Sequence, residues 1–540
     1  MPRLPRLQRP HTYDAVVVGA GPNGLVAANL LVDAGWSVVV VEAAEQPGGA
    51  VRSQADHPAP GYTADLFSAF YPLAAASTVL RDLHLEEHGL SWSHAPRVLA
   101  HMLDDGRAAV LSRDVEETAA SVEQFAPGDG AAWRRWVGWW QQVEEPALDA
   151  LLHPFPPVRP GLTMLRRLGV AGALHLARTA MVPVRTFGTQ EFGGDGARLL
   201  VAGNAMHTDL SPESAGSALY GLLLAMLGQT RGFPVPTGGA GRLTDALVGR
   251  LRSRGGELRC ASPVTRVDLG AEGAEGVTLA GGERLRASRA VLADVPAPAL
   301  YHSLVGTERL SAGLRRDLAR FDWDHGTLKV NWATSGPVPW RDPVAGLAGT
   351  VHLGGGLDDL TRGAADLATG SVPRRPFVLV GQMTSADPSR SPAGTQALWA
   401  YAHLPRGRQP REVVEDFARR IEDEVERAAP GFRDVVLARS VQGPADLEDS
   451  DGSLSGGALN GGTAALHQQL VLRPTPGTGR ADTPFPGLFL ASSSAHPGGG
   501  VHGACGANAA RAALARARFG RLYDGSAAAA LRLVERPSRR

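Results

Sequence analysis

The stretch that decides the fold is residues 13–42, which read YDAVVVGAGPNGLVAANLLVDAGWSVVVVE. Its apolar run at 15–18 predicts a buried parallel strand, and residues 25–34 predict a helix that stops at Gly35. A second apolar run, 38–41, predicts the next parallel strand. Strand, glycine turn, helix and strand in this order form the βαβ unit that binds dinucleotides.

The glycines of the turn have separate tasks. Gly19 permits the tight turn, Gly21 lets the backbone approach a pyrophosphate, and Gly24 allows the helix to pack closely on the strand. Glu42 ends the second strand 18 residues after Gly24, where a carboxylate can accept hydrogen bonds from a ribose. A glycine turn that binds nothing is the alternative, and the flanking strand, helix and acid argue against it. The contacts expected from this unit are Gly19, Ala20, Gly21, Pro22, Asn23, Gly24, Glu42 and Ala43.

The residues that follow favour FAD over NAD as the dinucleotide. Residues 46–53 read QPGGAVRS, and a glycine pair followed by a basic residue would return the chain to the same pyrophosphate. We therefore expect Gly49, Ala50 and Arg52 to contact the cofactor. No second strand, G-x-G-x-x-G turn and helix follows later in the sequence, so a separate nicotinamide domain is not expected.

Length and composition exclude several classes of protein. A chain of 540 residues exceeds a single core, so at least two domains are expected. The formal net charge of +0 argues against nucleic acid as a partner. The two cysteines, Cys260 and Cys505, form no C-x-x-C pair, which argues against a disulfide framework and against dithiol redox chemistry.

The sequence favours a cytoplasmic protein that contacts a membrane only at its surface. Residues 1–14 form a short basic arm without the apolar core of a secretory signal, and no run of about 18 uncharged apolar residues predicts a spanning helix. Residues 162–182 are apolar but include three arginines and a histidine. They predict either a helix in a membrane interface, with its arginines at the headgroups, or a helix of the ligand domain that its neighbours half cover.

A row of tryptophans marks another predicted helix. Trp133, Trp136 and Trp140 fall on one helical face, with Trp139 beside them. Such spacing is typical of core packing. A wall of the substrate site is the alternative.

A further signal for a flavin lies near the C-terminus. Residues 486–514 read PGLFLASSSAHPGGGVHGACGANAARAAL, in which 488–491 predict a last parallel strand and 503–507 the start of a helix. A helix N-terminus presents unpaired N–H groups and the positive end of the helix dipole. Aimed at the N1–C2=O edge of an isoalloxazine ring, it would stabilise the anionic reduced flavin.

Three blocks of sequence resemble the phytoene desaturase-type carotenoid oxidoreductases and the related pyridine nucleotide-disulfide oxidoreductase domain proteins. They are residues 16–53, 234–267 and 470–514, in the order that the family has. The resemblance implies an α/β fold of the glutathione-reductase or amine-oxidase type, with an FAD-binding Rossmann domain and an inserted mixed α+β substrate domain. The implied FAD domain comprises residues 11–91, 232–300 and 480–530, and the implied substrate domain comprises residues 92–231 and 301–479.

The resemblance also implies further cofactor contacts. They are Val264, whose backbone would bind the adenine, and Gly499, Gly500 and Val501, which would lie beside the flavin ring. The chain departs from the family at residues 492–494, where three serines replace small glycines. Ser493 and Ser494 are expected to hydrogen-bond the pyrophosphate or the ribityl hydroxyls.

The family reaction removes a hydride and a proton from adjacent carbons of a large apolar substrate and leaves FAD reduced. Lys329 is the one lysine among 54 basic residues and lies in a strand predicted at 327–333, so we expect it near the flavin N5. His496 is expected as a proton relay or a donor to the flavin edge. A salt bridge or an exposed end for Lys329 and backbone capping for His496 are the alternatives. No metal-ligand cluster is predicted.

The leading interpretation is an FAD-dependent desaturase or dehydrogenase of a lipophilic substrate, such as a polyene or a secondary metabolite. Oxygen or a quinone would reoxidise the flavin. Two alternatives stay open: an FAD-dependent cis–trans isomerase of a polyene without net redox, and a flavin-binding scaffold without turnover. The sequence indicates no particular oligomeric state.

Overall fold

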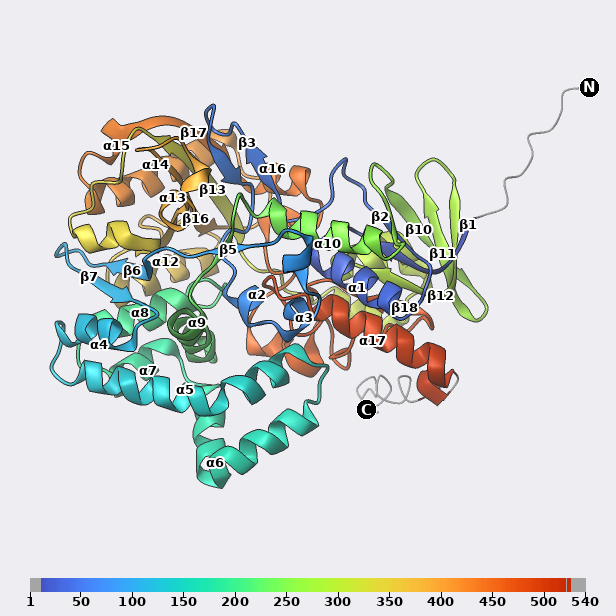
Figure 1. Ribbon diagram of the computed structural model, residues 1–540. Coiled ribbons are helices and arrows are strands. Elements are labelled where there is room, and N and C mark those ends of the chain that lie inside the picture. The colour runs from blue at the N-terminus through green and yellow to red at the C-terminus, as the bar shows by residue number, and fades with distance from the viewer. Residues whose placement is uncertain (1–10, 521, 526–540) are drawn as a thin grey trace, which may run out of the picture.

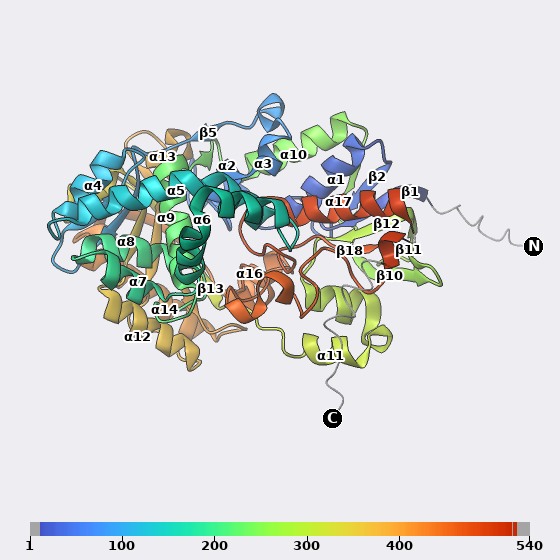
Figure 2. The ribbon, with the colours of Figure 1, turned by 90° about the horizontal axis from the view of Figure 1, so that it is seen from below.

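The computed structural model describes residues 11–520 and 522–525. The first ten residues of the basic arm and the last part of the 480–530 segment therefore lie outside the described residues. Figures 1 and 2 show two β-sheets toward opposite ends of the molecule, each covered by helices. The structure confirms the expected α/β architecture, in which a Rossmann-type domain carries a second domain.

The first sheet is the Rossmann sheet. Its strands follow the order β10-β11-β12-β1-β2-β9, and β18 pairs with β12. Strands β9, β2, β1, β12 and β18 run parallel, while β10 and β11 add an antiparallel edge. Their bounds are β1 (His11–Val18), β2 (Val38–Val41), β9 (Glu257–Arg259), β10 (Val264–Gly270), β11 (Gly273–Leu279), β12 (Arg284–Ala293) and β18 (Leu488–Leu490).

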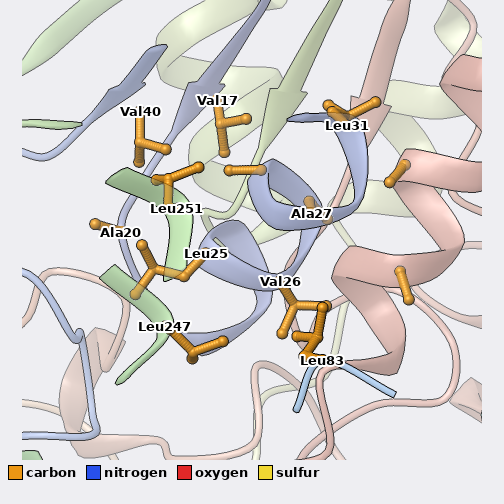
Figure 3. Close-up of a cluster of buried hydrophobic side chains, with 14 of the residues drawn as sticks. Val17, Ala20, Leu25, Val26, Ala27, Leu31, Val40, Leu83, Leu247 and Leu251 are labelled. Carbon is orange, nitrogen blue, oxygen red and sulfur yellow. The ribbon is translucent and has the colours of Figure 1, made fainter. Parts of the chain in front are cut away.

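Three helices pack on one face of this sheet: α1 (Pro22–Asp33), α10 (Gly241–Ser253) and α17 (Ala504–Phe519). Figure 3 shows the apolar face of α1 between strands β1 and β2 and helix α10. The buried side chains there include Val17, Leu25, Leu31, Val40, Leu247 and Leu251. Burial of such aliphatic side chains contributes roughly 1.5–3 kcal/mol each, so this cluster is a main source of the domain's stability.

Two expected elements differ from the structure. Helix α1 begins at Pro22, three residues before the predicted start, because a proline with its fixed φ fits the first helical turn. Residues 257–269 (ELRCASPVTRVDL) alternate in polarity, which predicts one strand, but the structure has two, β9 and β10. The chain turns between them at Ala261, which has a φ of 48°. β9 then pairs with β2, and β10 pairs with β11.

The second sheet lies in the other half of the molecule and follows the order β17-β13-β16-β15-β14-β6-β7. Its strands are β6 (Arg97–Met102), β7 (Ala108–Leu111), β13 (Gly326–Thr334), β14 (Ala348–Leu353), β15 (Val378–Gln382), β16 (Gln396–Leu404) and β17 (Val436–Gln442). Two short pairs complete the strands, β3 (Ser53–Ala55) with β4 (Thr63–Asp65) and β5 (Trp92–Ser93) with β8 (Val235–Pro236).

Helices surround this sheet. One group comes from the middle of the chain: α4 (Val115–Glu123), α5 (Asp129–Leu152), α6 (Val158–Thr179), α7 (Val184–Glu191), α8 (Asp195–Ala205) and α9 (Ser217–Arg231). The other α-helices of the described residues are α2 (Pro72–Ala76), α3 (Thr78–Arg81), α11 (Ala312–Leu318), α12 (Leu357–Ala368), α13 (Met383–Ala386), α14 (Arg411–Ala428), α15 (Phe432–Val435) and α16 (Pro444–Ser450). Two of them belong to the Rossmann end: α11 packs on the first sheet and α3 packs beside α1.

The two sheets draw their strands from alternating parts of the chain. Those of the first sheet come from residues 11–41, 257–293 and 488–490, and those of the second from 97–111 and 326–442. The domain boundaries implied by the resemblance stay a prediction. Within the described residues, no helix combines the length and the apolar character needed to cross a membrane.

We expect Gly506→Ala to destabilise the Rossmann domain. A Cβ at Gly506 would lie 1.9 Å from the backbone oxygen of Asn23, so α17 would have to move away from α1. Overpacking of this kind costs roughly 1–3 kcal/mol. Thermal and urea unfolding of the full chain would measure the loss.

Gly249→Ala is the matched control for Gly506→Ala. Gly249 lies in helix α10 with nothing near its Cβ position, so the change should stabilise the helix by roughly 0.5–1 kcal/mol. Equal unfolding midpoints for the two variants would contradict the close contact between α1 and α17.

Candidate functional site

A cavity of about 1370 Å³ connects the two halves of the molecule. Its lining begins at the glycine turn between β1 and α1 and passes over strands β13 and β16. It continues to helices α5, α6 and α9. The predicted dinucleotide and substrate sites would therefore share one continuous space.

The backbone of several glycines forms part of the Rossmann end of the cavity. A Cβ at Gly24 would lie 2.2 Å from the Gly19 oxygen, and Gly19 itself has a φ of 96°. A Cβ at Gly49 would lie 3.2 Å from the Cα of Gly21. Only glycines allow these approaches, and they leave room for a phosphate group beside the backbone.

Helix α1 presents its N-terminus at the same place. Its N-cap, Gly21, provides no side-chain hydrogen bond, so the first turn keeps N–H groups for a ligand. The Oδ1 atom of Asn23 is buried without a hydrogen-bond partner among the described residues. A bound pyrophosphate would accept hydrogen bonds from the uncapped helix end, and a hydroxyl of the cofactor would be the donor that the Asn23 oxygen lacks. The residues present therefore fit FAD.

Glu42 holds the loops of this site together. Its Oε2 atom accepts a hydrogen bond from the Ala20 N–H at 2.7 Å, and its Oε1 atom accepts one from the Ala44 N–H at 2.8 Å. The carboxylate also borders the cavity. It is thus fixed in position where the sequence predicts a contact with the ribose.

Most of the predicted cofactor contacts border the cavity. These are Gly19, Gly21, Pro22, Asn23, Glu42, Ala43, Gly49, Ala50, Arg52, Val264, Ser493, Gly499, Gly500 and Val501. Three others do not. Ala20 donates its N–H to Glu42, Gly24 donates its N–H to Asp294, and the Ser494 hydroxyl donates to the Gly461 oxygen at 2.8 Å. These three shape the site from behind its lining.

Two carboxylates that the sequence analysis did not single out face the same end. Burial raises the pKa of Asp294 to about 7, and the nearby Asp451 and Glu42 add to that shift. Burial also raises the pKa of Asp451. Beside them, the Arg52 guanidinium donates to the backbone oxygens of Gly49 and Ser450. Partial protonation of Asp294 near neutral pH limits the negative charge that a pyrophosphate would meet.

Lys329 reaches the cavity from strand β13. Its ammonium donates hydrogen bonds to the backbone oxygens of Asp65 and Phe67 and lies 5.4 Å from the centre of the Trp399 ring. The residue is 3% exposed, and burial lowers its pKa to about 7. A lysine that changes charge near neutral pH is suited to proton handling.

A buried ion pair supports the segment that holds Lys329. The carboxylate of Asp65 lies 2.7 Å from the Arg390 guanidinium, and neither side chain is exposed. Asp65 also accepts hydrogen bonds from the Ser53 hydroxyl and the Ala240 N–H. These bonds fix the backbone oxygen of Asp65, which accepts a hydrogen bond from Lys329. The fold therefore determines the position of the ammonium.

His496 also borders the cavity, and the structure gives it a backbone contact. Its Nε2 atom lies 3.1 Å from the His153 oxygen. Burial lowers the pKa of His496 to about 4, so the ring is neutral at pH 7. The contact with His153 agrees with the capping alternative, and the proton-relay role stays a prediction.

An aromatic floor is the main feature that sequence reasoning missed. Trp399 and Tyr401 of strand β16 stack with an interplanar angle of 8° and ring centres 5.9 Å apart. Phe70 lies 6.0 Å from the Trp399 ring. A Cβ at Gly381 would clash with the indole at 2.2 Å, so this glycine lets Trp399 lie flat on the sheet. The alternation of aromatic residues at 399 and 401 was the available signal.

The tryptophans of helix α5 divide between two tasks. Trp133 and Trp136 are buried and donate to Gln229 and Glu191, respectively, as expected for core packing. Trp139 and Trp140 border the cavity. Core packing therefore holds for Trp133 and Trp136, and the substrate-wall interpretation of the other two stays a prediction. No group of histidine, cysteine and acidic side chains in the described part of the chain is placed to hold a metal ion.

Comparisons with known proteins agree with this geometry. The flavin containing amine oxidoreductase family matches residues 23–514. The chain is 30% identical to pyridine nucleotide-disulfide oxidoreductase domain-containing protein 2 of Rattus norvegicus, with 92% of each chain covered. It is 28% identical to a hydroxyneurosporene desaturase of Cereibacter sphaeroides, with 93% of this chain and 97% of the relative covered.

The fold is also that of solved structures. An oxidoreductase from Methanosarcina mazei superimposes with a TM-score of 0.61 at 15% identity, with 93% of this chain and 99% of the other covered. The glycine turn that leaves room for a phosphate, the uncapped N-terminus of α1 and the family match have one common explanation. The chain belongs to the flavin-containing amine oxidoreductase family, and its cofactor is FAD.

Proposed function

We propose that the protein is an FAD-dependent desaturase or dehydrogenase that introduces a C=C bond into a lipophilic polyene. The observation that carries this proposal is one continuous cavity. It runs from the glycine turn between β1 and α1 to a space lined by aromatic and aliphatic side chains. Such a chamber takes up an extended apolar molecule with favourable burial of its surface. The hydroxyneurosporene desaturase and phytoene desaturase relatives support the polyene as the substrate class.

FAD, when bound, would accept the hydride, which carries the two electrons of the oxidation. The chain's own residues do the rest. The stacked Trp399 and Tyr401 rings offer a flat surface for a conjugated chain, and the aliphatic walls exclude water from the reacting carbons. The Lys329 ammonium is a proton donor that its hydrogen bond to the Phe67 oxygen keeps at a fixed position in the same cavity. Oxygen or a quinone would serve as the final electron acceptor.

Substrate access is the second part of the proposal. Helix α6 lies at the outer edge of the molecule and breaks at Gly169, where φ is 65° and ψ is -179° (Figures 1 and 2). Val170 and Leu174 on this helix are 70% and 67% exposed. Met164 and Leu176 of the same helix border the cavity. One element thus forms a wall of the cavity and exposes apolar side chains to the outside.

Charge on α6 favours an anionic lipid surface as the partner. The helix contains Arg159, Arg166, Arg167 and Arg178, and no acidic residue lies within Val158–Thr179. Arginines beside exposed aliphatic residues are typical of helices that lie in a membrane interface. We infer that the polyene reaches the cavity from a lipid surface past α6.

A substrate screen on the FAD-loaded full chain tests the proposed reaction. Phytoene and hydroxyneurosporene in lipid vesicles should bleach the flavin band without oxygen and lose two hydrogens per new double bond. Absorption spectroscopy and mass spectrometry measure the two changes. A geometric isomer formed without bleaching would establish the isomerase instead. A flavin that no polyene reduces and no oxidant reoxidises would establish the scaffold.

The titration of Lys329 predicts a pH-dependent stability. The native pKa of about 7 lies below the value of about 10.4 in an unfolded chain. Between these values the unfolded chain binds the proton and the native one does not, so stability rises with pH in that window. The melting temperature of the wild type, relative to Lys329→Met, should therefore increase from about pH 7 to about pH 9.

Thr327→Val is the control for that measurement. Thr327 is 2% exposed and lies two residues before Lys329 on the same strand, but it does not titrate. Its substitution should shift the melting temperature by the same amount at each pH. Parallel curves for the wild type and Lys329→Met would show that the lysine keeps its ordinary pKa.

The lipid contact is tested with vesicles of phosphatidylglycerol and phosphatidylcholine. Val170→Asn with Leu174→Asn should weaken co-sedimentation at least about tenfold, because each buried aliphatic side chain contributes roughly 1.5–3 kcal/mol. Leu437→Asn is the control, since Leu437 is 60% exposed on strand β17 in another part of the molecule. Equal binding by all three proteins would refute the role of α6.

A further inference from the structure

The second sheet carries two neighbouring rows of residues on one face. In the first row, Lys329 pairs in register with Tyr401, and Tyr401 pairs with Leu379. Leu379 pairs with His352, which pairs with His101. In-register residues of neighbouring strands share one face of a sheet. From Lys329 to His352 this row crosses three strand spacings, which is a distance of about 14 Å.

Trp399, Gly381 and Thr350 form the second row. Each lies two residues along its strand from a member of the first row, and alternate residues of a strand point to the same side. The indole of Trp399 lies across Gly381, where a Cβ would meet it at 2.2 Å. The aromatic floor of the cavity therefore reaches over strand β15 toward Thr350 on strand β14.

Thr350 presents a hydroxyl group without a partner at the end of this floor. The residue borders the cavity and is 1% exposed, and its Oγ1 atom has no hydrogen-bond partner among the described residues. A buried polar group that lacks a partner destabilises a protein, so such groups are rare. A polar group that enters the cavity would remove this cost.

His207 brings a second polar group to the same part of the cavity. It borders the cavity just after helix α8, and its Nε2 atom lies 2.9 Å from the Nε2 atom of His352. Its Nδ1 atom forms no hydrogen bond with another residue in the described part of the chain. His352 is thus bonded to His207 and is the neighbour of Thr350 on the same face of β14.

This part of the cavity favours an uncharged ligand group. Burial lowers the pKa of His207 to about 4 and that of His352 further, so both rings are neutral at pH 7. In the two rows, only Lys329 can carry a positive charge near neutral pH, and it lies about 14 Å from His352. An ionised group buried so far from an opposite charge would be costly.

A hydroxyl matches the hydrogen-bonding groups that are present. In the bond between His207 and His352, one nitrogen donates and the other accepts. The Nδ1 atom of His207 is an acceptor if its Nε2 donates, and a donor if its Nε2 accepts. A ligand hydroxyl pairs with either form, and the Thr350 hydroxyl supplies the complementary bond. A carbonyl or ether oxygen only accepts, and a hydrocarbon does neither.

We propose that Thr350 and His207 form a subsite for a hydroxyl group of the substrate, so that the cavity selects hydroxylated polyenes over hydrocarbons. The inference rests on the proposed function, which supplies the polyene. The apolar part of the substrate lies along Trp399 and Tyr401 toward Lys329. A hydroxyl held at one end of this floor determines which pair of carbons lies beside Lys329.

A competition between two polyenes tests the subsite on the FAD-loaded full chain. Neurosporene, a hydrocarbon, and hydroxyneurosporene, which carries a hydroxyl group, are supplied in equal amounts in detergent micelles. Gel filtration of the protein and chromatography of its extract measure the ratio that is bound. The wild type should bind the alcohol at least about tenfold better, because the hydrocarbon leaves the polar groups of the subsite unpaired.

The outcomes of the competition separate the two proposals. Equal binding of the two polyenes would overturn the subsite and leave the proposed function standing. Binding of neither polyene would contradict the proposed function itself, and the subsite with it.

Thr350→Val separates hydrogen bonding from packing. Valine has nearly the same shape without the hydroxyl, so neurosporene should bind at least as well as to the wild type. Hydroxyneurosporene should bind about tenfold more weakly, whereas damage to the fold would weaken both. Thr350→Ser keeps a hydroxyl and should keep the preference, and His207→Phe should reduce it. An unchanged preference in Thr350→Val or His207→Phe would overturn the subsite.

Thr327→Val is the matched control. Thr327 is also buried and borders the cavity, but its hydroxyl lies 3.5 Å from the Nδ1 atom of His403. Its substitution should leave the preference for the alcohol unchanged. If Thr327→Val reduced the preference as much as Thr350→Val, the assignment to Thr350 would be wrong.

Thermal unfolding without any polyene provides a second measurement. The melting temperature of Thr350→Val should equal or exceed that of the wild type, because valine removes a hydroxyl that has no partner. A clear loss of stability in Thr350→Val would show that the protein itself satisfies this hydroxyl, and it would overturn the subsite.

Discussion

The whole structure depends on the close approach of backbones that carry no Cβ. Gly24 contacts the Gly19 oxygen, Gly49 contacts Gly21, and Gly506 contacts the Asn23 oxygen. These contacts bring segments from the start and the end of the chain against one helix N-terminus. A dinucleotide can bind there only because the polypeptide itself leaves the space open. The aromatic chamber is useful only because it opens onto that space.

The Rossmann unit was predictable because its information is local. Strand, turn and helix follow one another within 13–42, and their periodicities show their type without knowledge of the rest of the chain. The errors also have local causes: the proline at the first helical position extends α1, and the turn at Ala261 divides a strand. The register of strands far apart in sequence carries no such signal, so the row from Lys329 to His101 became visible only in the structure.

The candidate site also consists of residues that sequence motifs predict and residues that they do not. Glycines, Glu42 and Arg52 were found because a known motif assigns tasks to their spacing. Ala20, Gly24 and Ser494 belong to the same motifs, yet they bond to the protein and shape the lining from behind. Trp399 and the buried Asp65–Arg390 pair have no motif. Their importance follows from burial and from partners hundreds of residues away, which a single sequence does not reveal.

Burial leaves the cavity with little free charge. Asp65 and Arg390 neutralise each other, Lys329 and Asp294 titrate near pH 7, and the histidines along the sheet are neutral. In a medium of low dielectric constant, this arrangement avoids isolated charges. The proposed dehydrogenation, however, would separate a hydride from a proton inside that medium. A site with so little free charge would depend for that proton on groups that titrate near neutral pH, Lys329 above all.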